Sequence, residues 1–172
     1  MKKYYVLLLI AGLVVALDQW TKWLVRTNIP LNGLWLPESF HWLSAYARVA
    51  FIYNSGAAFG MFQNGNLIFT LFAFLVLCGI LYYYSQIELG NWSLRLASGL
   101  YLGGVLGNLI DRLTMGKVTD FISIGNFYIF NIADASINIG VVILLVSFWL
   151  SERKKPGNSP ENEVLSANGE LS

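Results

Sequence analysis

Four apolar stretches, each close to the length that crosses a lipid bilayer, constrain this chain more than any other feature. They cover about residues 4–24, 67–84, 92–110 and 132–150. A membrane helix needs roughly 20 consecutive apolar residues to span the hydrocarbon core. With 56% hydrophobic and only 12% charged residues, the 172-residue chain is far more apolar than a soluble domain. The sequence therefore predicts an α-helical membrane protein with four transmembrane helices.

Basic residues near the chain ends predict its orientation. Lys2, Lys3, Arg95 and the cluster at 153–155 lie on one side of the membrane if the four spans alternate. Short loops rich in lysine and arginine usually stay in the cytoplasm. We therefore expect both termini to be cytoplasmic, with residues 1–155 forming one integral-membrane domain.

The regions between the spans have a different composition. By this topology the loops at about residues 25–66 and 111–131 are extracytoplasmic, and residues 48–53 have the composition of a β-strand. We expect a small extracytoplasmic β-sheet or flap that forms a platform on the membrane. Residues 156–172 are rich in Pro, Gly, Asn, Ser and Glu, which predicts a disordered cytoplasmic tail.

Charge and residue counts exclude several classes of function. The net charge is +1 and the longest basic run is three residues, so we expect no nucleic-acid partner. One histidine, His41, and one cysteine, Cys78, provide neither a nucleophilic triad nor a disulfide. Zinc sites need several such ligands. No metal or cofactor is predicted.

Polar residues gather near the extracytoplasmic ends of the predicted spans. Asp18 and Lys22 are four residues apart and can pair along a helix. Asp111 with Arg112 can equally end the third helix in water. Polar groups inside a membrane are costly, so the helix faces that carry these residues should point into the interior of the helix bundle. The residues placed at this membrane face are Asp18, Asn54, Asn108, Asp111, Asp120, Asn131 and Asp134.

Asp120 and Asp134 have the best sequence context for chemistry. Asp120 lies in the strand-like "VTDFI", and Asp134 begins a helix after "FNIA". The turn signal Gly125-Asn126 between them predicts a hairpin that lets the two carboxylates meet. Two carboxyl groups held together cannot both ionise cheaply, which provides an acid and a base near neutral pH. Peptide hydrolysis without a covalent intermediate needs such a pair.

A transporter or proton relay is the alternative interpretation, because intramembrane Asp and Asn are equally characteristic of that class. Transporters usually have two repeated halves. The chain has no internal repeat, which lowers this alternative without excluding it.

Five separated motifs resemble the lipoprotein signal peptidases (signal peptidase II), the membrane aspartic peptidases of bacteria. They are "DQWTK", "NSGAAF", "GVLGNLIDR", "VTDF" and "FNIADASI", in the order of the family. The resemblance implies that Asp120 and Asp134 are the catalytic pair. It also implies residues that line or brace the site, namely Asp18, Lys22, Asn54, Gly56, Asn108, Asp111, Arg112, Asn131 and Ala133.

The same resemblance implies the substrate and the location. The family's substrates are prolipoproteins whose cysteine already carries diacylglyceryl, and cleavage on the N-terminal side of that cysteine removes the signal peptide. We expect a multi-pass protein of the bacterial inner membrane, with its site at the extracytoplasmic face. Its partners would be these substrates and the lipid bilayer, and we expect a monomer.

Overall fold

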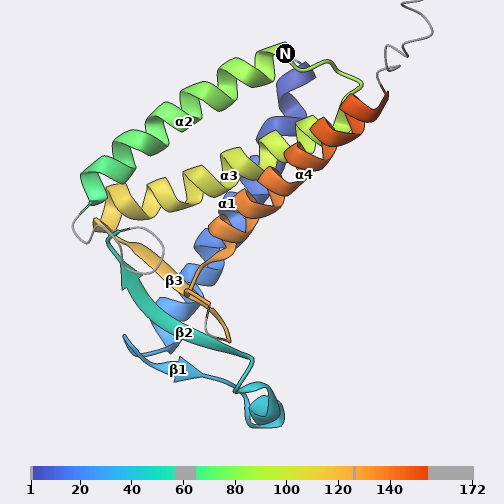
Figure 1. The fold of residues 1–172 in the computed structure, drawn as a ribbon. Coiled ribbons are helices and arrows are strands. Elements are labelled where there is room, and N and C mark those ends of the chain that lie inside the picture. Colours follow the sequence, from blue (N-terminus) through green and yellow to red (C-terminus); the bar gives the residue numbers. More distant parts are fainter. Residues whose placement is uncertain (1, 57–64, 126, 155–172) are drawn as a thin grey trace, which may run out of the picture.

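The computed structural model describes residues 2–56, 65–125 and 127–154, and the predicted tail at 156–172 lies outside them. Four helices and a small sheet make up the fold (Figure 1). The helices are α1 (Lys2–Asn28), α2 (Asn66–Gln86), α3 (Trp92–Met115) and α4 (Ile132–Lys154). The strands are β1 (Leu34–Trp35), β2 (Ala47–Asn54) and β3 (Val118–Ile124), with a short 3-10 helix, η1 (Glu38–Leu43), between β1 and β2.

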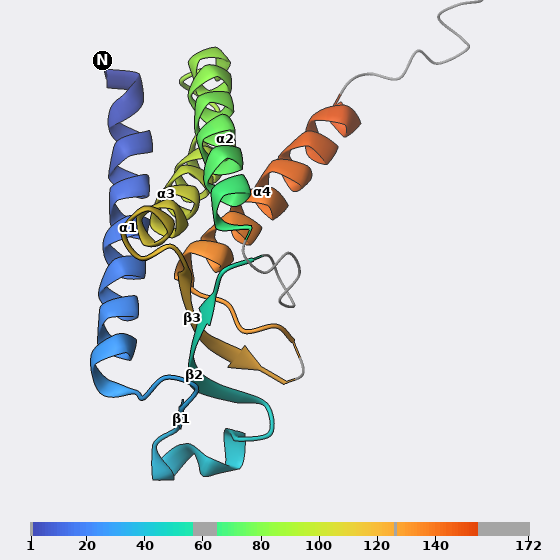
Figure 2. The same cartoon turned by 90° about the vertical axis from the view of Figure 1, so that its left-hand side faces the viewer.

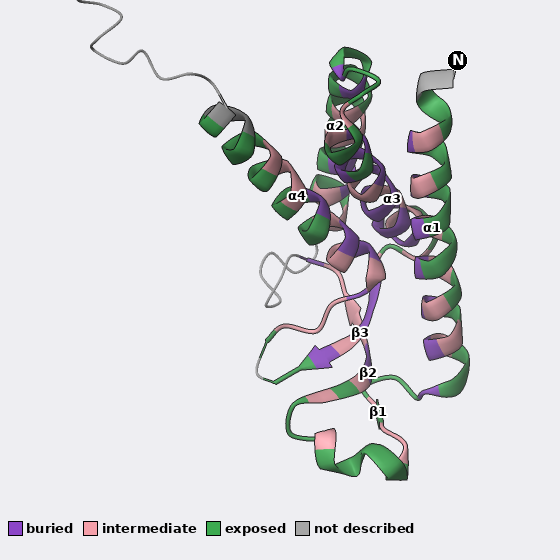
Figure 3. Ribbon diagram, turned by 90° about the vertical axis from the view of Figure 1, so that its right-hand side faces the viewer, coloured by how far each residue is buried: buried purple, intermediate pink, exposed green. Residues whose placement is uncertain are grey.

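Four long helices are present, but their apolar character differs. Among the described residues, three helices are long and apolar enough to cross a membrane, at Tyr4–Asn28, Asn66–Gln86 and Ile132–Leu150. Helix α3 is of similar length, 24 residues, but carries charged residues near both ends and several glycines. It lies between α1 and α4 and is largely buried by them (Figure 3). Protein rather than lipid therefore surrounds much of its surface.

Three glycines, spaced four residues apart, let α3 approach α1 closely. A Cβ atom on Gly99 would lie 2.7 Å from the Ile10 side chain, and one on Gly103 would lie 2.6 Å from Val14. A Cβ on Gly107 would lie 2.6 Å from Asp18 Oδ2. Small residues at such positions allow two helix backbones to pack against each other.

The sheet lies at the end of the helices opposite to the start of α1 and the end of α4 (Figures 1 and 2). Its three strands are antiparallel in the order β1-β2-β3, and Ile52 of β2 is paired with Asp120 of β3. The prediction of a small sheet that includes residues 48–53 is confirmed. Strand β3 follows α3 directly, because Gly116 ends the helix with a left-handed φ of 72°.

The predicted hairpin after β3 is also present. Gly125 has a φ of 52°, and Phe130 pairs with Ile122 in an antiparallel bridge. Asn126 of the turn lies outside the described residues. Because the chain turns back beside β3 before α4 begins at Ile132, Asp120 and Asp134 come to the same end of the molecule.

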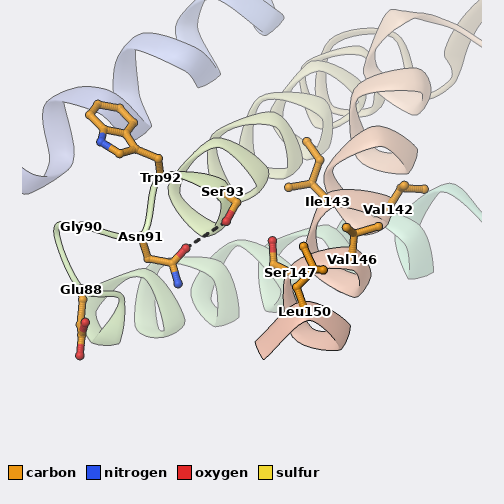
Figure 4. Close-up of a pocket in the computed structure, with 10 residues that line it drawn as sticks. All are labelled: Glu88, Gly90, Asn91, Trp92, Ser93, Val142, Ile143, Val146, Ser147 and Leu150. Atoms are coloured by element: carbon orange, nitrogen blue, oxygen red, sulfur yellow. Dashed lines mark hydrogen bonds between the residues drawn. The ribbon is translucent and has the colours of Figure 1, made fainter. Parts of the chain in front are cut away.

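A cavity of about 680 Å³ lies at the other end of the helices (Figure 4). The connection between α2 and α3 lines one side of it, and the second half of α4 lines the other. Asn91 caps α3 there, since its side chain accepts hydrogen bonds from Leu94 N at 3.2 Å and Ser93 Oγ at 3.1 Å. None of the predicted site residues lines this cavity.

The close approach of α1 and α3 predicts a large effect of Gly103→Ala. The new methyl group would meet the backbone oxygen of Ala11 at 2.9 Å as well as Val14, so α1 must shift. We expect a loss of about 1–3 kcal/mol in unfolding free energy, as for an overpacked core. Thermal unfolding in detergent measures it. In the matched control Gly79→Ala nothing lies within 4 Å of the new atom, so its stability should be unchanged or higher. Equal melting temperatures for the two variants would contradict this packing.

Candidate active site

Asn131 joins the two predicted catalytic aspartates. Its side-chain Nδ2 donates to Asp120 Oδ1 at 2.7 Å, and its backbone N donates to Asp134 Oδ2 at 3.2 Å. Asp120 comes from β3 and Asp134 from the first turn of α4. The structure thus brings together these three residues, which the sequence analysis selected.

The start of α4 holds Asp134 in place. Asn131 Oδ1 accepts from Asp134 N at 3.0 Å, while the Asp134 carboxylate accepts from Asn131 N. This reciprocal pair is the capping box that begins many helices, here built from asparagine and aspartate. Because both its backbone N–H and its carboxylate are hydrogen-bonded to Asn131, Asp134 has little freedom to turn away from Asp120.

Two further asparagines complete the hydrogen bonds of the carboxyl pair. Asn54 Nδ2 donates to Asp120 Oδ2 at 3.1 Å, and Asn108 Nδ2 donates to Asp134 Oδ1 at 2.8 Å. Asn54 Oδ1 in turn accepts from Gly56 N at 2.9 Å, which fixes the amide. All four carboxyl oxygens of the pair therefore accept a hydrogen bond, each from a different N–H group.

Burial gives Asp120 an unusual affinity for a proton. Asp120 is only 2% exposed. Burial, followed by the negative charge of Asp134, raises the pKa of Asp120 to about 7, and hydrogen bonds from Asn54 and Asn131 oppose that rise. Near neutral pH this carboxyl group can therefore exchange a proton, as an acid-base catalyst must.

A buried cluster of one lysine and two carboxylates lies next to the catalytic candidates Asp120 and Asp134. Lys22 Nζ is 2.8 Å from Asp18 Oδ2 and 3.3 Å from Asp111 Oδ2, and it donates to Asn108 Oδ1 at 3.1 Å. The predicted pairing of Asp18 with Lys22 is confirmed. Asp111 is 0% exposed, so the interpretation that it ends the helix in water is wrong. It is buried because Lys22 and the start of β3 surround it.

The two buried carboxylates hold the backbone next to the aspartates. Asp18 Oδ1 accepts from Ala133 N at 3.0 Å, and Asp111 Oδ2 accepts from Thr119 N at 2.9 Å. Ala133 thus contributes its backbone N–H to the site, and its small side chain faces Gly107.

Arg112 occupies a different position from the other predicted residues. Its guanidinium group lies over the ring of Phe69, 5.7 Å from the ring centroid, and its backbone oxygen accepts from Gly116 N at the end of α3. Its positive charge still interacts with Asp134 and Asp120. The charge of Arg112 is therefore felt by the carboxyl pair, while its backbone oxygen takes part in ending α3.

Sequence reasoning missed three residues that support the site, Gln19, Arg26 and Thr119. Gln19 Nε2 lies within hydrogen-bonding distance of Asp18, of Asp111 and of the backbone oxygen of Gly107, at 3.2, 3.1 and 3.0 Å. Arg26 donates to Thr119 Oγ1 at 3.0 Å. Arg26 could have been found from the sequence, because it lies four residues after Lys22 and therefore on the same helix face.

Relatives with curated names resemble this chain over most of its length. The family model described as signal peptidase (SPase) II matches residues 10–150. The lipoprotein signal peptidase of Symbiobacterium thermophilum is 38% identical over 151 residues, covering 86% of this chain and 96% of the relative. That of Bacillus subtilis is also 38% identical over 151 residues, covering 86% of this chain and 95% of the relative.

Solved structures agree with the sequence relatives. A bacterial membrane enzyme solved at 2.3 Å resolution superposes with a TM-score of 0.80 at 29% identity, covering 89% of this chain and 93% of the other. A second, solved at 1.9 Å resolution, gives a TM-score of 0.73 at 30% identity, covering 83% and 91%. This chain is therefore a membrane peptidase that belongs to the signal peptidase II family.

Proposed function

We propose that this protein removes the signal peptide from diacylglyceryl-modified prolipoproteins, cutting on the N-terminal side of the lipidated cysteine. Family membership supports the substrate class, and the peptidase family replaces the transporter interpretation. One observation carries the catalytic assignment. Asn131 joins Asp120 to Asp134, and each of their four oxygens accepts a hydrogen bond from its own donor.

The proposed chemistry assigns different resting states to the two carboxyl groups. We assign the resting proton of the pair to Asp120, because burial and the charge of Asp134 together raise the pKa of Asp120 to about 7. Ionised Asp134 then removes a proton from a water molecule that attacks the scissile carbonyl. Asp120 delivers its proton to the leaving amine as the tetrahedral intermediate collapses, so the pair exchanges its roles during one turnover.

The membrane would supply much of the substrate binding. In our proposal all four helices span the inner membrane with both termini in the cytoplasm, and the sheet and the aspartates lie at the extracytoplasmic face. The signal helix and lipid chains of the substrate then remain in the bilayer, and only the scissile bond reaches the carboxyl pair. Such partitioning converts a three-dimensional search into local positioning. We also propose that the protein acts as a monomer.

Asn54 and Gly56 lie at the edge of this site, at the end of β2. In our proposal they sit in a flap that covers the site. The residues that follow, 57–64, lie outside the described part of the chain. Asn54 would connect the flap to Asp120 through its hydrogen bond. Removing that amide should weaken activity less than removing either aspartate.

The catalytic assignment predicts that Asp120→Asn and Asp134→Asn each abolish almost all turnover. Asparagine keeps the shape of the side chain but cannot exchange a proton, so we expect kcat to fall by about 10²–10⁴ or more. The measurement is cleavage of a diacylglyceryl-modified prolipoprotein by purified protein in detergent or vesicles, without added metal. Glu88→Gln, at the opposite end of the helices, is the matched control and should cleave normally.

The double variant sharpens this test. Groups that act as one unit are not additive, so Asp120→Asn with Asp134→Asn should be no slower than either single variant. Wild-type protein that does not cleave this substrate would contradict the substrate assignment. Cleavage at near wild-type rates by either single variant would contradict the catalytic pair.

The raised pKa of Asp120 predicts a fall in activity on the alkaline side. Asp120 is protonated below its pKa of about 7 and loses the proton above it, so kcat should decline as pH rises through that range. Infrared spectroscopy can check the assignment independently of turnover. The absorption of a protonated carboxyl group should titrate near neutral pH in wild-type protein and disappear in Asp120→Asn. A band that persists in that variant would place the proton elsewhere.

A further inference from the structure

The backbone is held in the same way beside each proposed catalytic aspartate. The residue immediately before Asp134 donates its N–H to Asp18, and the residue immediately before Asp120 donates its N–H to Asp111. These donors, Ala133 and Thr119, are both 0% exposed. The start of β3 and the start of α4 are thus each hydrogen-bonded to a buried carboxylate, one residue before the proposed catalytic aspartate.

Lys22 connects the two carboxylates. Its ammonium group has three N–H donors, and three oxygen atoms lie within reach: Asp18 Oδ2 at 2.8 Å, Asp111 Oδ2 at 3.3 Å and Asn108 Oδ1 at 3.1 Å. The side chains of Lys22 and Asp18 are 0% exposed and that of Asp111 is 1% exposed. Water cannot replace the lysine there. Without its charge, buried Asp18 would lose its cation, and buried Asp111 would keep only the longer ion pair with Arg26, whose Nη1 lies 3.7 Å from Asp111 Oδ1. Leaving buried carboxylates so poorly compensated is strongly unfavourable.

We propose that Lys22 is a positioning residue that sets the spacing between Asp120 and Asp134. Lys22 holds Asp18 and Asp111 at a fixed separation, and each of these carboxylates holds the backbone next to one catalytic aspartate. Its third contact, Asn108, donates directly to Asp134. The inference rests on the proposed function, and it assigns to a buried residue of α1 a role in aligning β3 with α4.

Charged groups from four elements lie in and around the site, and the charge of Lys22 is one of those that set the pKa of Asp120. Asp18 and Arg26 come from α1, Asp111 and Arg112 from α3, Asp120 from β3 and Asp134 from α4. The positive charge of Lys22 lowers the pKa of Asp120 and so opposes the effect of burial. Removing that charge raises the pKa of Asp120 further, and this carboxyl group keeps its proton to higher pH.

Lys22→Met is the first test, because methionine retains an unbranched stem without the charge. Misplacement of reacting groups by about 1 Å costs about 10²-fold in rate, so we expect kcat to fall by about that factor. KM should change little, since Lys22 is fully buried and cannot touch substrate. The alkaline decline of kcat should move to higher pH. Arg153→Met, which removes a cation at the far end of α4, is the matched control and should retain wild-type kcat, KM and pH profile.

Comparison in an Asp18→Asn background separates positioning from general damage. The amide oxygen introduced by Asp18→Asn can still accept from Ala133 N. In this background, removing Lys22 leaves one buried carboxylate, Asp111, without its lysine instead of two. We expect Lys22→Met to lower kcat about tenfold less in this background than in wild type, because the two residues act as a unit. The comparison remains informative if Lys22→Met alone does not fold, since the double variant is read against Asp18→Asn.

Opposite outcomes would overturn the inference. They are wild-type kcat in Lys22→Met, a raised KM with unchanged kcat, an unmoved pH profile, or equal losses in both backgrounds. Failure of this inference differs from failure of the proposed function. If wild-type protein cleaves the prolipoprotein and both Asp→Asn variants of the catalytic pair are inactive, these outcomes reject only the role of Lys22.

Discussion

Burial of three carboxyl groups, with a fourth partly buried beside them, is the constraint on which the rest of this structure depends. Asp18, Asp111, Asp120 and Asp134 converge from separate elements, and removing such groups from water costs several kcal/mol each when nothing compensates. The fold compensates the two pairs in different ways. Asp18 and Asp111 share the charge of Lys22, whereas Asp120 and Asp134 are held by neutral amides. Amide donors stabilise a carboxylate without fixing its charge, so the second pair remains free to exchange protons.

The packing of the helices follows from this arrangement. Lys22 reaches α3 only because α1 lies against a surface of glycines, and Gly107 leaves the space that Asp18 occupies. Helix α4 is equally close to α3, where Gly104 faces the backbone of Ala133. Small residues in α3 therefore do more than join helices. Because they let the helix backbones pack closely, the Asp18 carboxylate of α1 reaches the backbone N–H of Ala133 in the first turn of α4.

Sequence patterns predicted the elements and the chemistry better than the network that supports them. Apolar length indicated four long helices, although the polar residues and glycines of α3 belong to a helix surrounded by protein. Strand composition and the turn at Gly125 brought Asp120 near Asp134. The contacts of Gln19 and Thr119 were not predictable, because they depend on the register between α1, α3 and β3. The burial of Asp111 is not predictable from the sequence for the same reason, since nothing local distinguishes a buried helix end from a solvated one.

The capping box at the start of α4 joins catalysis to secondary structure. In our proposal Asp134 accepts a proton from water, and a protonated carboxyl group is a much weaker acceptor for Asn131 N–H than a carboxylate. The first turn of α4 then keeps its N-cap bond from Asp134 N to Asn131 Oδ1, but the reciprocal bond from Asn131 N is weakened for as long as the proton stays. Returning the proton restores the reciprocal bond. The helix end therefore favours the starting protonation state and helps to reset the site after each cleavage.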